Sequence, residues 1–169
     1  YDLLLLPEAK AYFKELCSYH VSGQLKVAPE HVSDKVLHLM RKPAFKVYEE
    51  FVKAFDEVSG EACGRVKKQY LVQYFITAHP GCDAVDAHKL ALFTKKMGYT
   101  PEQIQDFIPL PMTRSSVMYY TGIDPGEGKA LGKPLYVPKG RAARSMQREA
   151  VQQRKKTVSS VSKQLLTGS

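Results

Sequence analysis

The sequence lacks any long apolar run. None of its 169 residues lie in a stretch that approaches the roughly 20 apolar residues of a membrane-spanning helix. The apolar run Leu3 to Leu6 is much shorter than the core of a signal peptide, and no basic region precedes it. We therefore expect no membrane partner. The chain opens with Tyr1-Asp2 and no initiator Met, so we expect it to be a piece of a longer protein.

Cysteine is scarce. The three cysteines, Cys17, Cys63 and Cys82, are odd in number and widely spaced, and no C-x-x-C pair occurs. This pattern does not support a zinc site, which needs closely spaced cysteines. It does not support a disulfide framework either, because that needs an even number of cysteines. Scattered single thiols are typical of a reducing compartment, and we expect a cytoplasmic protein.

Common chemical motifs are also missing. The sequence contains no phosphate-binding loop, nucleophile elbow or zinc-protease motif. It contains no aromatic-rich RNA-binding motif either. The sequence by itself therefore identifies no catalytic residue.

Acidic residues are almost absent from the last quarter of the chain. Residues 1–128 hold 15 Lys or Arg and 16 Asp or Glu, a net charge of −1, whereas residues 129–169 hold 10 basic residues and only Glu149, a net charge of +9. A basic tail can bind nucleic acid weakly, because binding releases counterions. Weak contact of residues 141–169 with nucleic acid is therefore one interpretation. The favoured interpretation is a solvated extension.

Apolar and β-branched runs alternate with amphipathic segments along the first two-thirds of the chain. The alternation predicts an α/β fold with parallel strands joined by crossover helices. Four strands do not close a barrel, so we expect a partial barrel or a small open sheet. The expected strands are 1–6, 25–28, 70–78 and 104–108, and the expected helices are 8–20, 33–40, 44–58 and 83–97.

Three regions are expected. Residues 1–118 form the partial barrel. Residues 119–140 contain five glycines and three prolines, which predicts an extended arm. Residues 141–169 are expected to be a basic helix or tail, in which Met146, Ala150 and Val151 dock on the rest of the protein.

Polar side chains within the strands mark the candidate site. Lys26 and Glu30 are four residues apart on one strand, and Gln73 and His79 are six apart on another, so each pair is expected to share a face. We predict that the four converge at the carboxyl ends of the strands, where parallel sheets bind ligands. The alternative is a structural salt bridge between Lys26 and Glu30.

Two histidines lie just past the ends of predicted strands. His31 and His79, with Glu30 nearby, are residue types that bind metals. No ligand spacing supports such a site, so a hydrogen-bonding role is the favoured interpretation and no metal ligand is assigned.

Several segments together resemble a known superfamily. They are LKVAPEHVSDKVLHLMRKP from Leu25, QYLVQYFITAHPG from Gln69, QIQDFIPLPMT from Gln103, SSVMYYTG from Ser115 and PLYVPKG from Pro134. Residues 1 to about 140 resemble the C-terminal part of the YgiQ-type radical S-adenosylmethionine (SAM) proteins.

The resemblance implies a six-stranded partial β/α barrel, of which this chain would supply the last four strands. It also implies SAM and a [4Fe–4S] cluster in the full-length protein. The family binds its cluster through C-x-x-x-C-x-x-C, which is absent from this chain. The missing N-terminal half would be the principal partner, and this fragment alone is expected to be inactive.

The resemblance also implies cofactor-binding residues. Polar contacts to the ribose and methionine parts of SAM map to Lys26, Glu30 and His31. Gln73 and His79, from the next predicted strand, are included in the same cofactor-binding set. Apolar and backbone contacts to adenine map to Ile76, Ala78, Phe107 and Ile108. The substrate is unknown.

Two functions are therefore open. The first is a fragment of a radical SAM enzyme, which cleaves SAM reductively to start radical chemistry. The alternative is a non-catalytic α/β binding module whose basic tail contacts RNA or a partner, as suggested by the split in charge.

Overall fold

A three-stranded parallel sheet forms the centre of the molecule. The computed structural model describes residues 1–63, 68–97, 101, 103–126 and 132–152. The strands are β1 (Gln24–Glu30), β2 (Tyr70–Thr77) and β3 (Gln103–Asp106), and they pair in sequence order. The parallel pairing predicted for these three strands is confirmed. Within the described residues the sheet is open and does not close into a barrel.

The predicted strand at residues 1–6 is wrong. Asp2–Leu5 is a 3-10 helix (η1), followed by a second one at Pro7–Ala9 (η2). Leucine has a strong helix propensity and no β-branch, so a leucine run does not by itself favour extended backbone. Tyr1 packs against Tyr48 and Phe51, and this contact holds the segment on the helical layer.

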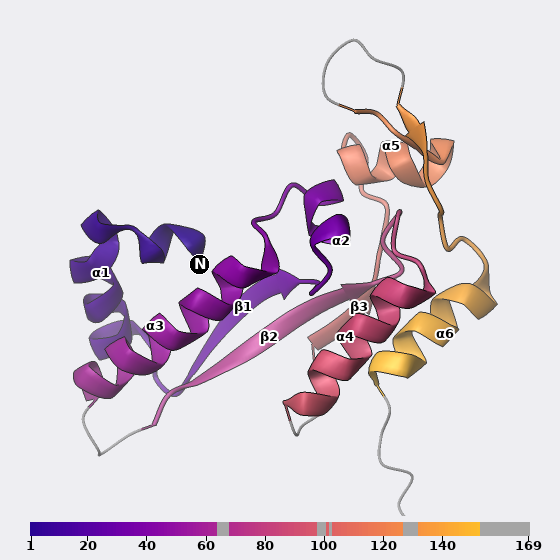
Figure 1. Cartoon of the computed structure of the whole chain (residues 1–169). Helices are drawn as coiled ribbons and strands as arrows, with labels where there is room; N and C mark the ends of the chain where they lie inside the picture. Colours follow the sequence, from indigo (N-terminus) through magenta and orange to yellow (C-terminus); the bar gives the residue numbers. More distant parts are fainter. Residues whose placement is uncertain (64–67, 98–100, 102, 127–131, 153–169) are drawn as a thin grey trace, which may run out of the picture.

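Helices cover one face of the sheet (Figure 1). The segment Lys10–Glu15 (α1) continues into a π-helical turn, Leu16–His20 (η3). The long helix Phe45–Cys63 (α3) lies over β1 and β2, and its inward face joins an aromatic core. That core contains Phe13, Cys17, Tyr48, Phe51 and Phe55. Burial of these large side chains provides most of the driving force that fixes this layer.

The helix Ala84–Lys96 (α4) begins at a capping box. The Asp83 carboxylate accepts hydrogen bonds from the backbone N–H groups of Val85 and Asp86, and the Asp86 carboxylate accepts one from the Asp83 N–H. This arrangement satisfies backbone donors that a helix start leaves unpaired.

Further elements gather around the carboxyl ends of the strands (Figure 1). They are Asp34–Leu39 (α2), Arg114–Thr121 (α5), the two-residue antiparallel strands Ile123–Asp124 (β4) and Lys133–Pro134 (β5), and Arg141–Val151 (α6). The arm predicted at 119–140 thus includes the end of α5 and a small hairpin. Residues 153–166 of the predicted C-terminal helix lie outside the described residues.

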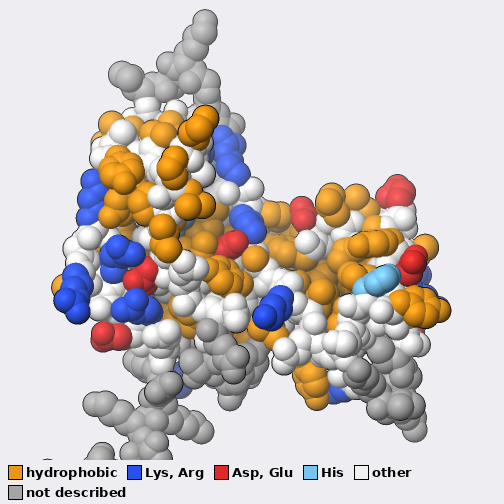
Figure 2. All heavy atoms as spheres, turned by 180° about the vertical axis from the view of Figure 1, so that it is seen from behind, with side chains coloured by type: hydrophobic (Ala, Val, Ile, Leu, Met, Phe, Trp, Pro, Cys, Tyr) orange, Lys and Arg blue, Asp and Glu red, His pale blue; other side chains and the backbone are white. Residues whose placement is uncertain are grey.

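The other face of the sheet is not covered by the described helices. It carries Ala28, Val72, Tyr74 and Ile76, all partly exposed. Figure 2, which views the molecule from behind, shows hydrophobic side chains grouped with Lys and Arg on this side. In the described part of the chain, no helix is both long and apolar enough to cross a membrane.

Candidate functional site

The carboxyl edge of the sheet brings three sequence-distant segments together. β1 ends at Glu30, β2 is followed by Ala78 and His79, and β3 ends at Asp106. Glu30 and Ala78 have positive φ angles of 68° and 58°, in the left-handed region that is costly for residues other than glycine. Such backbone persists only where its surroundings enforce it, and it is enriched at binding sites.

The pairing register separates two of the predicted site residues. Lys26 pairs with Val72, and Val27 pairs with Gln73. Val27 packs on the aromatic core, so Gln73 lies on the helix-covered face, and Lys26 is exposed on the other face. The prediction that Lys26 and Gln73 line one concavity is wrong. Phe75, and not Val72 or Ile76, packs fully buried against the helical layer.

A β-bulge changes the orientation of Glu30. The register shifts between Val27 and Glu30, and Glu30 pairs with Phe75. The four-residue spacing therefore does not keep Lys26 and Glu30 on one face, because a bulge adds a residue to one strand and breaks the alternation.

The Glu30 carboxylate is only half satisfied. Its Oε1 lies 3.3 Å from Lys42 Nζ, so Lys42 takes the place predicted for Lys26 in the structural alternative. Its Oε2 is buried with no hydrogen-bond partner among the described residues. Burial raises the pKa of Glu30, and Lys42 opposes that rise. A buried carboxylate oxygen without a donor is costly, which makes Oε2 a candidate ligand acceptor.

His79 is held by hydrogen bonds on both ring nitrogens. Nδ1 lies 2.7 Å from the Pro80 carbonyl oxygen, and Nε2 lies 2.8 Å from Ser115 Oγ. A carbonyl can only accept, so Nδ1 carries the proton and Nε2 accepts from the serine hydroxyl. The ring stacks edge-on with Phe107 at 5.0 Å. Burial lowers the pKa of His79 to about 4, against the opposing effect of the Pro80 bond, so the ring is neutral at pH 7.

His31 belongs to a buried polar network. Its Nδ1 accepts a 3.0 Å hydrogen bond from the Ser33 backbone N–H, and its Nε2 lies 3.6 Å from Cys82 Sγ. Burial lowers the pKa of His31 to about 4, although Asp86 opposes this. Burial also raises the pKa of the Cys82 thiol to about 12, so Cys82 remains protonated. These neutral groups bind one another and are not exposed to solvent.

Gln147 of α6 closes that network. Its Oε1 accepts from the Ala78 backbone N–H at 2.9 Å and from the Cys82 thiol at 3.2 Å, and its Nε2 donates to the Cys82 carbonyl at 2.9 Å. Sequence reasoning missed Gln147 and placed Met146 at the docking face. Met146 is 57% exposed, and the buried residues of α6 are Gln147 and Val151, spaced by four. The i, i+4 spacing was the available signal, but glutamine is rarely read as a buried residue.

The four residues expected to contact adenine have different surroundings. Ile76 is partly exposed on the uncovered face, and Ile108 is 53% exposed. The Ala78 backbone N–H is taken by Gln147, and Phe107 is buried between His79 and Tyr119. Only Ile76 and Ile108 of this set are accessible to a ligand.

The described residues offer no ligand set for an iron–sulfur cluster. They contain no group of three His, Cys, Asp or Glu close enough to bind a metal ion. Cys17 and Cys82 are buried, in different parts of the structure, and the Cys63 side chain lies outside the described residues. Cluster binding requires about four thiolates gathered around one centre, so the described residues do not fit a cluster.

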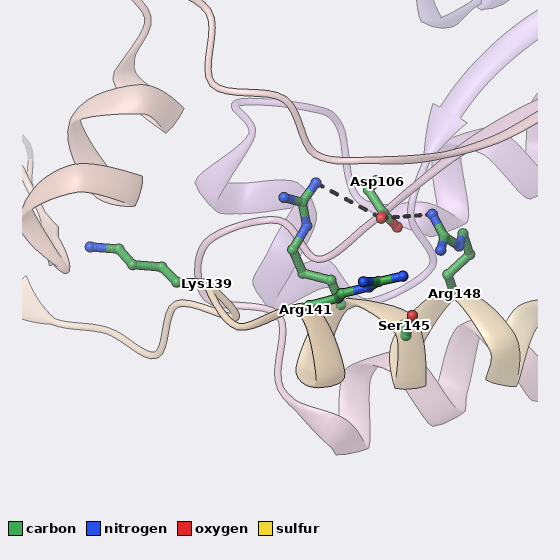
Figure 3. Close-up of a pocket in the computed structure, with 6 residues that line it drawn as sticks. Asp106, Lys139, Arg141, Ser145 and Arg148 are labelled. Carbon is green, nitrogen blue, oxygen red and sulfur yellow. Dashed lines mark hydrogen bonds and ion pairs between the residues drawn. The ribbon is translucent and has the colours of Figure 1, made fainter.

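A basic pocket lies beside the end of β3 (Figure 3). Its volume is about 370 Å³, and its lining residues are Asp106, Lys139, Arg141, Arg144, Ser145 and Arg148. Asp106 Oδ2 lies 3.0 Å from Arg148 Nη1 and 3.8 Å from Arg144 Nη2. The pocket thus combines four cations with one carboxylate.

The relatives of this chain share one description. It is 49% identical over 152 residues to a UPF0313 protein of Clostridium botulinum (strain 657 / Type Ba4), which covers 90% of this chain and 23% of that protein. The chain is a homologue of one segment of the UPF0313 proteins. A UPF0313 protein of Clostridium perfringens (strain 13 / Type A) is 45% identical over the same length.

The chain spans less than a quarter of the length of these UPF0313 relatives. No protein-family model matches the chain, and no solved structure matches it. A match over 152 of the 169 residues includes the three strands β1, β2 and β3.

Proposed function

We propose that this chain is the C-terminal part of a radical SAM barrel, and that it contributes SAM-binding residues to a site completed by the rest of a longer protein. The observation that carries the proposal is the buried, unpartnered Oε2 of Glu30 at the carboxyl edge of a parallel sheet. Ligands bind at this edge in α/β folds, and a free acceptor there suits a donor on a ligand. The resemblance of residues 1 to about 140 supplies the identity of that ligand.

The uncovered face of the sheet supports the same proposal. Val72, Tyr74 and Ile76 are partly exposed there, although they are apolar enough for a protein interior. Further strands from the longer protein would bury this face and extend the sheet at its unpaired edges.

The proposed role of Glu30 follows from its unpartnered oxygen, which accepts a hydrogen bond from a ribose hydroxyl. Lys26 lies on the other face of the sheet, so no contact with the cofactor is assigned to it. Ile76 and Ile108 contact the adenine ring. His31, Gln73 and His79 are buried, so they hold the edge in place and do not touch the cofactor. SAM bound beside a reduced cluster would accept one electron from it and supply an organic radical for hydrogen removal from a substrate. The cluster ligands would come from outside this chain.

The test is the Glu30→Gln substitution in the full-length protein that contains this chain. Glutamine keeps the shape but removes the negative charge, so the affinity for SAM is expected to fall about tenfold, the loss expected for one charge-assisted hydrogen bond. Anaerobic calorimetry with SAM measures the affinity, and circular dichroism checks the fold. Glu50→Gln, an exposed change on α3, is the matched control and should leave the affinity unchanged. Equal affinity of Glu30→Gln and wild type would refute the assignment.

The binding-module alternative rests on the charge of residues 129–169, which is +9. It predicts RNA binding that falls steeply with salt and is lost when Arg154, Lys155 and Lys156 become glutamine. SAM binding in the same protein would be absent under this alternative.

A further inference from the structure

The basic pocket has a charge imbalance that its own residues do not resolve. Arg141, Arg144 and Arg148 occupy positions i, i+3 and i+7 of α6, so all three lie along one side of the helix. Among the described residues, Asp106 is the only acid that lines the pocket. Its Oδ1 already accepts a 2.8 Å hydrogen bond from the Thr77 hydroxyl, and its Oδ2 meets Arg148 and Arg144. Three guanidinium groups against one carboxylate leave two positive charges.

The arginines differ in how firmly they are engaged. Arg144 also donates to the Phe107 carbonyl at 3.2 Å, and Arg148 is paired with Asp106. Arg141 is exposed and forms no ion pair with the described residues. Lys139 extends away from Asp106 in Figure 3 and donates to the Tyr120 carbonyl at 3.3 Å. Arg141 is therefore the guanidinium most available to a ligand.

The start of α6 adds to the positive potential. The helix has 11 residues and begins after Gly140, which offers no side-chain cap. Its first backbone N–H groups and its dipole favour an anion near Arg141. Ser145 adds a hydroxyl to the pocket lining.

We propose that this pocket binds the phosphate group of a small phosphorylated molecule. A phosphate monoester carries between about −1.5 and −2 charges at pH 7, which matches the two positive charges that the guanidinium groups leave uncompensated. Guanidinium groups bind phosphate oxygens with paired hydrogen bonds. A volume of about 370 Å³ lies within the range of small-molecule sites, so it accommodates the phosphate and part of the attached molecule. The three arginines line one hollow, which favours a compact ligand over a nucleic-acid strand, whose phosphates follow a longer groove.

The pocket lies at the same edge of the sheet as Glu30, since Asp106 is the last residue of β3. The proposal does not depend on radical chemistry, because it rests only on the pocket's charge, size and lining. Its test uses phosphate ligands and no SAM, so its outcome is separate from that of the Glu30 experiment.

The test is calorimetry on the full-length protein at constant ionic strength, with inorganic phosphate, ribose 5-phosphate, ribose and a single-stranded RNA as probes. We expect ribose 5-phosphate, the monophosphate probe, to bind and ribose to bind at least tenfold more weakly. Arg141→Gln should weaken monophosphate binding about tenfold, and Arg141→Lys less, because lysine keeps the charge but loses the paired geometry. Lys53→Gln, an exposed change on α3, is the control and should have no effect.

Unchanged monophosphate affinity in Arg141→Gln would overturn the proposal, as would equal affinity for ribose and its monophosphate. Should Arg141→Gln fail to fold, Ser145→Ala provides the second variant, with a smaller expected loss of two- to threefold. If RNA binds more tightly than the monophosphate and its binding depends on Arg141, the small-molecule proposal is overturned. The ligand of the pocket would then be nucleic acid.

Discussion

His31 and His79 are neutral, buried and hydrogen-bonded at both ring nitrogens. The free energy of unfolding should therefore depend on pH. The pKa of each ring is lowered from 6.5 to about 4 in the folded protein, chiefly by burial. Above pH 6.5 both rings are neutral in the folded and unfolded states. As the pH falls from 6.5 to 4, the unfolded state takes up protons that the folded state does not, so the free energy of unfolding decreases.

We expect this loss to reach at most roughly 3 kcal/mol per histidine once the pH is below 4. Urea unfolding at a series of pH values measures it. His79→Gln should give a shallower dependence because one titrating group is gone. His38→Gln is the control, since His38 is exposed on α2, and should leave the dependence as it is. Identical curves for His79→Gln and wild type would contradict the buried, neutral assignment.

At the scale of elements, the Gln147 side chain joins α6 to the loop that follows β2. Gln147 binds the backbone on both sides of His79, at Ala78 and Cys82. Arg148 adds an ion pair to Asp106 at the end of β3, and Val151 joins a small apolar cluster with Phe75 and Leu90. The helix therefore fixes the loop that carries His79, even though the two are far apart in the sequence.

Gln147→Ala should destabilise the protein by about 3 kcal/mol, because it leaves the Ala78 N–H and the Cys82 carbonyl buried without partners. Urea unfolding gives the free energy, and hydrogen exchange at the Ala78 amide should become faster. Glu149→Ala, an exposed change on the same helix, should alter stability by less than about 0.5 kcal/mol. A Gln147→Ala protein as stable as wild type would mean that α6 is anchored elsewhere.

The elements also differ in how well local sequence specified them. The helices expected at 44–58 and 83–97 are confirmed by α3 and α4. Arg114–Thr121 and the hairpin after it were missed, because glycine and proline nearby suggested an irregular arm. A short helix with a modest apolar side gives little periodic signal.

At the scale of the whole molecule, the dispersed cysteines lead to a prediction about metal content. This chain by itself should bind no [4Fe–4S] cluster after anaerobic reconstitution, because the thiols of Cys17 and Cys82 are buried in separate clusters. Iron and sulfide analysis of the chain gives the result. The full-length protein, treated in parallel, is the positive comparison under the proposed function. A stoichiometric cluster in this chain that disappears on Cys-to-Ala substitution would show that the fragment itself carries the ligands.

The sequence by itself determined the alternation of three strands with helices, and hence a parallel α/β sheet, because periodicity and β-branched content act over a few neighbouring residues. It also marked the strand ends, where Glu30 and His79 lie. The tertiary structure decided which face each side chain takes. The β-bulge before Glu30 and the register between β1 and β2 put Lys26 and Gln73 on opposite sides. It also decided that Gln147 is buried and that residues 2–5 are helical. These outcomes depend on contacts between residues about 40 to 70 positions apart, whose free energies no local pattern contains.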